Sequence, residues 1–205
     1  QRNRYLSAMT DGSLIWAQAW SEPGAGSDLA SIRSTARRDD ERGGWLLNGQ
    51  KTWSSRAVWA DRGFGLFRSD PAAQRHRGLT YFLFPMDAPG LTVRPIAQLD
   101  GSTGFAELFF EDVFVPDTAV LGAPGEGFRY AQVRLGPARL THCMRWLGLA
   151  RRAMDIALDR TNTREIFGSA MHELGIAQDM LALNVLDLET SDAIITKTAM
   201  LLDAD

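Results

Sequence analysis

The stretch Ala19–Asp28, Ala-Trp-Ser-Glu-Pro-Gly-Ala-Gly-Ser-Asp, combines hydroxyl side chains with glycines at the end of an apolar run. Leu14–Trp20 is apolar and aromatic and predicts a strand, which the proline and the glycines then end. Glycines let a backbone approach a ligand closely, and Ser21 and Ser27 supply hydroxyl groups beside them. This chemistry suits a flat, polar, partly anionic ligand. The alternative is a surface turn, in which the serines cap backbone groups. Glu22 is expected to be structural, because loop carboxylates usually satisfy nearby N–H groups.

A second stretch, Asn48-Gly49-Gln50-Lys51-Thr52-Trp53-Ser54-Ser55, follows in the chain. Asn-Gly is a strong hairpin signal, so it predicts a turn and then a strand that carries Trp53. The two stretches together resemble the acyl-CoA dehydrogenase family of flavoproteins, whose patterns are Thr/Ser-Glu-Pro-x-Gly-Ser-Asp and Asn-Gly-x-Lys-x-Trp-Ile-Ser/Thr. Members of that family have an N-terminal helical domain, a middle β-barrel and a C-terminal helical bundle.

The resemblance implies a role for each matching residue. Trp53 would pack against the isoalloxazine of FAD, the hydroxyl of Ser55 would bind flavin N5, and Ser54 is assigned to the cofactor with them. Ser21 would contact the pyrimidine end of the flavin, and Ser27 the CoA part of a thioester substrate. Without the resemblance, Trp53 would be expected in the core and each serine in a turn.

A third match, Arg164-Glu165-Ile166-Phe167-Gly168, resembles the family's Arg-x-x-Phe-Gly. It implies that Arg164 meets the FAD pyrophosphate, usually that of the neighbouring subunit, and that Phe167 lies near the adenine. A guanidinium suits a pyrophosphate because it forms bidentate, charge-assisted bonds. The family has a glutamine a few residues further on, whereas this chain has Gly175 or a neighbour there. The alternative is a surface arginine in a turn between two helices.

The run Leu135–Arg145 is similar to the subgroup called acyl-CoA dehydrogenase family members ten and eleven. It implies that Arg139 lies beside the substrate. His142 and Cys143 adjoin but face different directions on a helix, and no further Cys/His spacing suggests a metal site. Some family members place the catalytic Glu where this chain has Ala138, and most others place it in a later loop. We therefore assign no catalytic residue within the chain and expect the base beyond Asp205.

Composition and charge limit the functional classes. The 205 residues are 45% hydrophobic and 23% charged, with a net charge of −3 and a pI of about 5.6. This balance argues against nucleic-acid binding, and no apolar run reaches the length of a transmembrane segment. Cys143 is the single cysteine, so an internal disulfide is excluded. A reducing, intracellular compartment is expected, which would be the cytoplasm of a bacterium or the mitochondrion of a eukaryote.

Hydrophobic patterning predicts an α+β fold, an antiparallel β-barrel followed by part of an α-helical bundle. Short strands separated by turn signals run from Leu14 to Val115, whereas the pattern becomes helical from Phe128. We place the domain boundary near Gly122, so that 1–122 is the flavin- and acyl-CoA-binding barrel and 123–205 the start of the bundle. Gly136-Pro137 is expected to break the first helix, and a second helix is expected over 176–202. The family's N-terminal domain and later bundle helices are absent, which indicates a fragment.

The resemblance implies an FAD-dependent acyl-CoA dehydrogenase that oxidises an acyl-CoA to a trans-2-enoyl-CoA, as in fatty acid β-oxidation. It implies an electron-transfer flavoprotein as electron acceptor and a homodimer or homotetramer as the assembly. Two alternatives remain open at this point. One is a flavin-dependent oxidase or monooxygenase on the same fold, and the other is a non-catalytic module that retains the fold.

Overall fold

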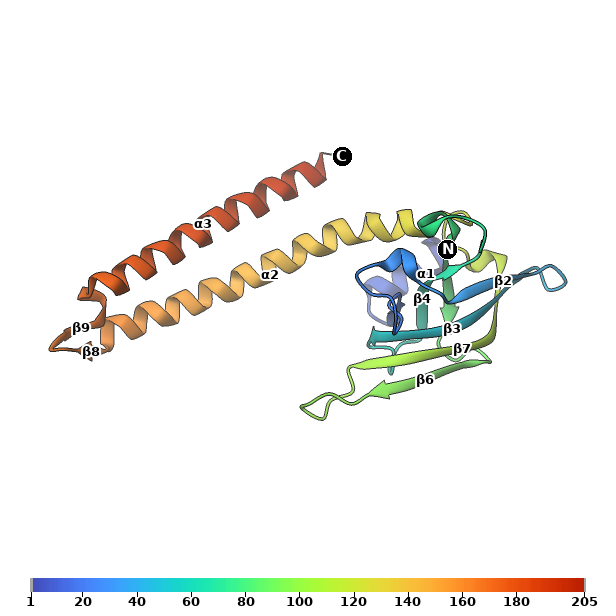
Figure 1. Ribbon diagram of the computed structural model, residues 1–205, viewed down its shortest axis with the longest axis horizontal. Coiled ribbons are helices and arrows are strands. Elements are labelled where there is room, and N and C mark those ends of the chain that lie inside the picture. The colour runs from blue at the N-terminus through green and yellow to red at the C-terminus, as the bar shows by residue number, and fades with distance from the viewer. Residues whose placement is uncertain (1, 205) are drawn as a thin grey trace. The chain divides into compact units, whose positions relative to one another are not determined.

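The computed structural model describes residues 2–204 (Figure 1), and side chains are described from residue 5 onward. Its helices are α1 (Arg2–Thr10), α2 (Gly127–Thr163) and α3 (Gly175–Asp203). Its strands are β1 (Trp16–Ala19), β2 (Thr35–Asp39), β3 (Gly44–Ser55), β4 (Arg62–Arg68), β5 (Leu79–Pro85), β6 (Leu91–Ile96), β7 (Phe105–Pro116), β8 (Glu165–Ile166) and β9 (Ser169–Ala170). Backbone contacts divide the chain into two compact units, 1–132 and 133–205, and each is described by itself.

A curled seven-stranded sheet forms the first unit, which confirms the α+β class. The strand order is β1-β4-β2-β3-β7-β6, and β5 pairs with β4. Most pairings are antiparallel, but β4 pairs in parallel with β1 and, through Thr35 and Arg68, with β2. Both strands lie along the same edge of β4, and the segment between them, Trp20–Ser34, leaves the sheet. The sheet is therefore a half-barrel of mixed direction, and the first glycine-rich stretch lies in its interruption.

The prediction of a hairpin turn at Asn48-Gly49 is wrong, because β3 continues through these two residues. The register against β7 shifts between Leu47 and Gly49, which indicates a bulge. The Asn48 side chain donates to the Asp112 carboxylate (2.9 Å), and the Asp112 N–H donates back to Asn48 (3.0 Å). Gly49 has φ +132, and a Cβ there would collide with Ser34. A long-range side-chain pair thus takes the place of the local turn.

Phenylalanine rings fill the core of the half-barrel. Phe67, Phe84 and Phe110 are buried, and Phe110 meets the other two edge-to-face at centroid distances of 5.0 and 5.1 Å. Edge-to-face pairs place the positive ring edge against a negative ring face, which adds to the gain from burial. The strands therefore enclose a core of their own, and the loop that follows β1 begins at the edge of this sheet.

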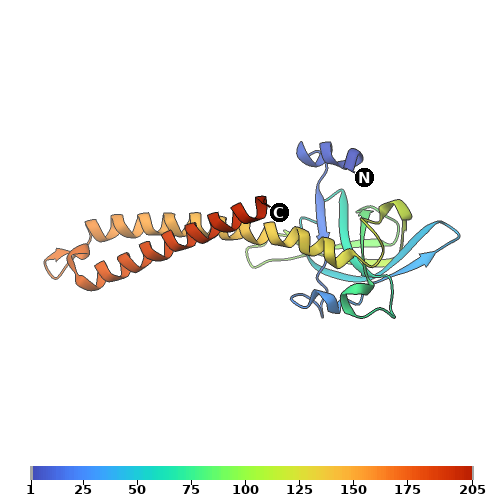
Figure 2. The ribbon, with the colours of Figure 1, turned by 90° about the horizontal axis from the view of Figure 1, so that it is seen from above.

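In the second unit, α2 and α3 lie side by side and are joined by the β8–β9 hairpin (Figure 2). Arg151 on α2 binds Asp192 on α3 at 2.8 Å. The break expected at Gly136-Pro137 is wrong, because α2 continues through Pro137. Proline removes a single N–H donor from the helix, and the surrounding residues keep helical geometry despite that cost. Helix α1 was not anticipated either, because residues 1–12 carry only a weak apolar pattern.

The first residues of α2 are grouped with the half-barrel. Ala131 is fully buried, and the N–H of Gly125 donates to the Thr80 hydroxyl at 2.8 Å. The division after Gln132 comes from backbone contacts, whereas the boundary near Gly122 is predicted from the change in sequence pattern. The boundary near Gly122 stays a prediction. Among residues 2–204, no helix has both the length and the apolar character that crossing a bilayer requires.

Candidate functional site

The structure brings Ser21 close to the strand that carries Trp53. Ser21 follows the end of β1, and its carbonyl accepts a hydrogen bond of 2.9 Å from the N–H of Thr52. Thr52 directly precedes Trp53 in β3. Three of the residues assigned to the flavin, Ser21, Trp53 and Ser55, therefore gather at the point where the first glycine-rich loop crosses β3.

Trp53 lies on a bulge and faces outward. Between the pairs Lys51–Leu108 and Ser54–Ala106, β3 has two residues where β7 has one. Trp53 has φ +56 and is 61% exposed, and its ring meets Phe105 edge-to-face at 6.0 Å. A positive φ costs a bulky residue on the order of 1–3 kcal/mol and recurs at functional sites. Trp53 is thus outside the core, with an open ring face available to a flat ligand.

The two serines after Trp53 lie in opposite environments. Ser54 is completely buried, and its Oγ has no hydrogen-bond partner among the described residues. Ser55 is exposed, as is Trp53 two residues before it. The Ser55 hydroxyl can therefore serve a ligand beside Trp53, whereas Ser54 could offer such a ligand only its backbone.

Glu22 has the structural role expected for it. Its carboxylate accepts hydrogen bonds from the N–H groups of Arg33 (2.6 Å) and Ser34 (2.9 Å) and from Lys51 Nζ (2.8 Å). Burial acts to raise the pKa of Glu22, but the charge of Lys51 and these hydrogen bonds outweigh it and lower the pKa. The carboxylate is therefore committed to holding the loop and stays ionised.

Lys51 is the residue that the sequence reasoning missed. It is fully buried, and its ammonium binds Glu22, the carbonyls of Leu66 (2.7 Å) and Trp20 (3.4 Å), and the face of Phe67. Burial lowers the pKa of Lys51 to about 8, against the opposing effect of Glu22. The sequence signal that could have identified Lys51 is its place in the Asn-Gly-x-Lys-x-Trp match. It lies two residues before Trp53, on the same strand.

Ser27 lies in an exposed part of the loop. The next residue, Asp28, forms an exposed ion pair at 2.8 Å with Arg75, which lies in the segment before β5. Ser27 is therefore accessible to a ligand at the surface of the half-barrel, within the same loop as Ser21.

The second unit presents Arg164 and Phe167 at the hairpin between its helices. Phe167 and Gly168 form the two-residue connection from β8 to β9, with φ +53 and +81, as a type I′ turn requires. Phe167 is 94% exposed, and the Arg164 side chain is also exposed. A large aromatic ring at a positive φ in full solvent contact has no packing reason in this unit.

Arg139 is exposed on α2, next to Ala138. Nearby, His142 Nδ1 and Arg145 are hydrogen-bonded at 2.8 Å.

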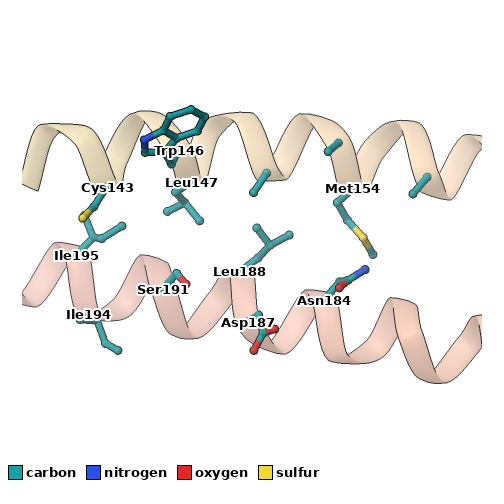
Figure 3. Close-up of a pocket in the computed structure, with 13 residues that line it drawn as sticks. Cys143, Trp146, Leu147, Met154, Asn184, Asp187, Leu188, Ser191, Ile194 and Ile195 are labelled. Carbon is teal, nitrogen blue, oxygen red and sulfur yellow. The ribbon is translucent and has the colours of Figure 1, made fainter.

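Cys143 lines a groove of about 760 Å³ between α2 and α3, where Leu147, Leu188 and Ile195 point toward the facing helix (Figure 3). Within residues 2–204, no group of three His, Cys, Asp or Glu side chains is arranged to hold a metal ion.

Comparison with known proteins gives a consistent result across the whole chain. The sequence profile "Acyl-CoA dehydrogenase, middle domain" matches residues 17–113, and "Acyl-CoA dehydrogenase, C-terminal domain" matches residues 125–205. "Acyl-CoA dehydrogenase FadE34" of Mycobacterium tuberculosis is 48% identical over 140 residues, which is 68% of this chain and 19% of that protein. Mouse "Acyl-CoA dehydrogenase family member 10" is 35% identical over 210 residues, which cover 99% of this chain and 20% of that protein.

Solved structures agree with the sequence matches. The acyl-CoA dehydrogenase of Geobacillus kaustophilus is 31% identical with a TM-score of 0.88, covering 97% of this chain and 53% of that one. The prolyl acyl carrier protein oxidase AnaB is 27% identical with a TM-score of 0.89, covering 97% of this chain and 52% of that one. The chain thus spans about half the length of these two proteins.

Proposed function

Because the chain belongs to the acyl-CoA dehydrogenase family, we propose that it is the flavin-binding centre of an FAD-dependent enzyme that oxidises an acyl-CoA thioester to a trans-2-enoyl-CoA. Relatives that match 99% of the chain are also named acyl-CoA dehydrogenases. The observation that carries the proposal is the exposed, strained Trp53 near the exposed Ser55 on β3. Ser21 is hydrogen-bonded to the same strand through Thr52.

These residues fit a flavin. An open indole face can stack on the isoalloxazine and exclude water from one side, and a hydroxyl beside it can donate to a ring nitrogen. Ser21 can donate to the pyrimidine end, where negative charge collects on reduction. When bound, FAD would supply the acceptor for the hydride that leaves the β-carbon of the substrate. The protein's own part is to orient the ring and to support its charge.

Two residues of the second unit are also proposed to contact FAD. The exposed guanidinium of Arg164 suits the pyrophosphate and the exposed ring of Phe167 suits the adenine. Arg164 is proposed to serve the FAD of a neighbouring subunit, so we propose a homodimer or homotetramer with closed symmetry. Light scattering of the full-length protein tests this, and a monomeric mass with FAD still bound would contradict it.

Ser27 and Arg139 are proposed to contact the acyl-CoA, and an electron-transfer flavoprotein is the proposed electron acceptor. The location would be the cytoplasm of a bacterium or the mitochondrion of a eukaryote. Proton removal from the α-carbon needs a carboxylate. Ala138 cannot provide one, and Glu22 is committed to Lys51 and the loop. We therefore propose that the base lies outside residues 1–205.

Two tryptophans with similar exposure provide a matched test of the cofactor site. Trp53 is 61% and Trp59 57% exposed, but only Trp53 lies on the bulge. In the full-length protein, we expect Trp53→Ala to lower the FAD content and to change the flavin absorption band, whereas Trp59→Ala should change neither. The assignment is contradicted if Trp53→Ala retains both the FAD content and the spectrum.

The position of the base is tested by mixing acyl-CoA thioesters of several chain lengths with FAD and protein under anaerobic conditions. The full-length protein should bleach the oxidised-flavin band, and the 205-residue chain should not. Loss of a positioned base costs on the order of 10²–10⁴ in rate. Bleaching by the 205-residue chain alone would place the base within it.

A flavin-dependent oxidase is the second candidate, because the structure of an oxidase matches this chain as well as that of a dehydrogenase does. The two differ in how the reduced flavin is reoxidised. Rapid reoxidation by air would favour the oxidase, and slow reoxidation would favour the dehydrogenase. A non-catalytic module is favoured only if the purified full-length protein contains no FAD.

A further inference from the structure

Lys51 occupies an interruption in the sheet. Along one edge of β4, β1 pairs as far as Gly65 and β2 begins at Arg68. Neither strand covers Leu66, whose carbonyl instead accepts a hydrogen bond of 2.7 Å from Lys51 Nζ. The ammonium also reaches the carbonyl of Trp20, the first residue after β1. A lysine side chain thus substitutes for a missing stretch of the backbone ladder.

Glu22 connects the same ammonium to the other end of the excursion. Its carboxylate receives the N–H groups of Arg33 and Ser34, which directly precede β2. Its own backbone forms a two-way pair with Ala25, at 2.7 and 3.0 Å. The loop that leaves the sheet after β1 and returns at β2 is therefore held at both ends by one buried ion pair.

Ser21 lies between these anchors. The preceding carbonyl binds Lys51, the following side chain is Glu22, and the Ser21 carbonyl binds Thr52. Lys51 and Thr52 are the two residues of β3 that come before Trp53. The position of the loop hydroxyl relative to the strained tryptophan is thus set through Lys51.

We propose that Lys51 and Glu22 are positioning residues, whose buried ion pair holds Ser21 and Trp53 in one fixed geometry for the flavin. The proposal rests on the proposed function, because it presupposes that a flavin binds at these residues. Neither side chain is open to a ligand: Lys51 is 0% and the Glu22 side chain 8% exposed. They act through the backbone of the loop and of β3.

An ion pair with this burial is not explained by stability alone. Removing the ammonium from water is expensive, and its pKa of about 8 reflects that cost. Replacement of a buried ion pair by neutral or apolar groups is often neutral or stabilising for folding, whereas removal of one partner leaves an unpaired charge. The double variant Glu22→Gln/Lys51→Met can therefore loosen the loop without unfolding the half-barrel.

The experiment compares that double variant with Val113→Ala in the full-length protein loaded with FAD. Val113 is fully buried in the apolar core of the half-barrel, belongs to β7, and has no polar group that could bind Lys51 or Glu22. The unfolding temperatures of both variants are measured as well. If the double variant acted only by lowering stability, its flavin properties should match those of Val113→Ala at a similar unfolding temperature. The readouts are the flavin absorption band, the flavin reduction potential and the rate of flavin reduction by acyl-CoA.

We expect the double variant to change the absorption band and the potential, and to slow reduction by up to about 10²-fold, the cost of a small misplacement. Val113→Ala should leave the band and the potential unchanged. Equal behaviour of the two variants would overturn the proposal. Glu22→Asp, which keeps the charge but shortens the reach, is the second variant if the double variant does not fold. An unchanged band in a folded Glu22→Asp protein would also overturn the proposal. If the unmodified protein binds no FAD, the proposed function fails instead.

Discussion

The two units of this chain manage burial in opposite ways. The half-barrel of 1–132 encloses aromatic rings and even a lysine, and it provides every hydrogen bond that the lysine ammonium makes. In 133–205, the described residues that are buried are Met154, Thr161 and Ala177. Large apolar side chains such as Leu183 and Ile194 are exposed instead, at 53% and 61%.

The difference follows from geometry. A curled sheet brings residues from distant strands to one interior, so that a polar group can be surrounded and still satisfied. Two helices meet along one line, and the remaining apolar surface of each has nothing to cover it. The first unit can therefore fix the position of a side chain, whereas the second presents side chains outward.

The largest expected effect tests this contrast in the core. Phe110→Ala removes a ring packed edge-to-face against Phe67 and Phe84. We expect a loss of about 3–5 kcal/mol in the free energy of unfolding. Leu183→Ala, on α3, should cost less than about 0.5 kcal/mol. Urea unfolding of the 205-residue chain, followed by tryptophan fluorescence, measures both. Similar losses would mean that the helical pair buries its apolar surface in solution.

The acid side of the stability curve gives an intermediate effect. The pKa of Glu22 is lower in the folded chain than its ordinary value of 4.5. Its contribution to stability is therefore complete above that value and is lost as the pH falls through the folded pKa. Lys51 stays protonated in both states throughout this range and adds no slope.

Glu22→Gln/Lys51→Met removes both groups, so it provides the reference for the acid experiment. The stability difference between the unmodified chain and this variant should fall below pH 4.5, by at most about 1.4 kcal/mol per pH unit. Urea unfolding at about pH 7, 5, 4 and 3.5 measures this stability difference over a range that spans the ordinary pKa of a carboxylate. A constant difference over that range would show that the carboxylate is not held as the structure indicates.

The smallest effect separates stability from binding in the second unit. Phe167→Asn places a residue that tolerates positive φ at the first turn position, and should stabilise the hairpin by about 1 kcal/mol or less. Slower amide hydrogen exchange at Ile166 and Ser169 would report the gain. In the full-length protein the same change should weaken FAD binding, because the exposed ring is lost.

Gly168→Ala is the matched control for the hairpin. It strains the second turn position, where φ is +81, and keeps the aromatic ring. We expect faster exchange in the hairpin together with FAD binding closer to that of the unmodified protein. Unchanged FAD affinity in Phe167→Asn would remove Phe167 from the proposed site.

Local patterns predicted much of the fold. The α+β class and the change from strands to helices follow from hydrophobic period, and the second helix was expected over 176–202 and is found at Gly175–Asp203. The structural role of Glu22 is also confirmed, because a carboxylate among free N–H groups has one obvious use. The roles assigned to Ser21, Trp53 and Ser55 stay predictions, although the structure brings these residues together.

The errors lie where a distant residue overrides a local signal. Asn48-Gly49 has the composition of a turn, but Asp112, 64 positions away, binds Asn48 and keeps β3 continuous. Pro137 has the composition of a helix break, but α2 continues through it. Lysine is usually a surface residue, but Lys51 can be buried because four partners interact with its ammonium group.

The sequence by itself determined which chemical groups are present and the local periodicity that orders them into strands and helices, because both depend on near neighbours. It also determined the family, since the motifs keep their order and spacing. Only the tertiary structure decided which of those groups are accessible. Whether Trp53 faces outward, Ser54 inward or Lys51 into a gap of the sheet depends on register and bulges, which are set by pairings between strands far apart in the chain.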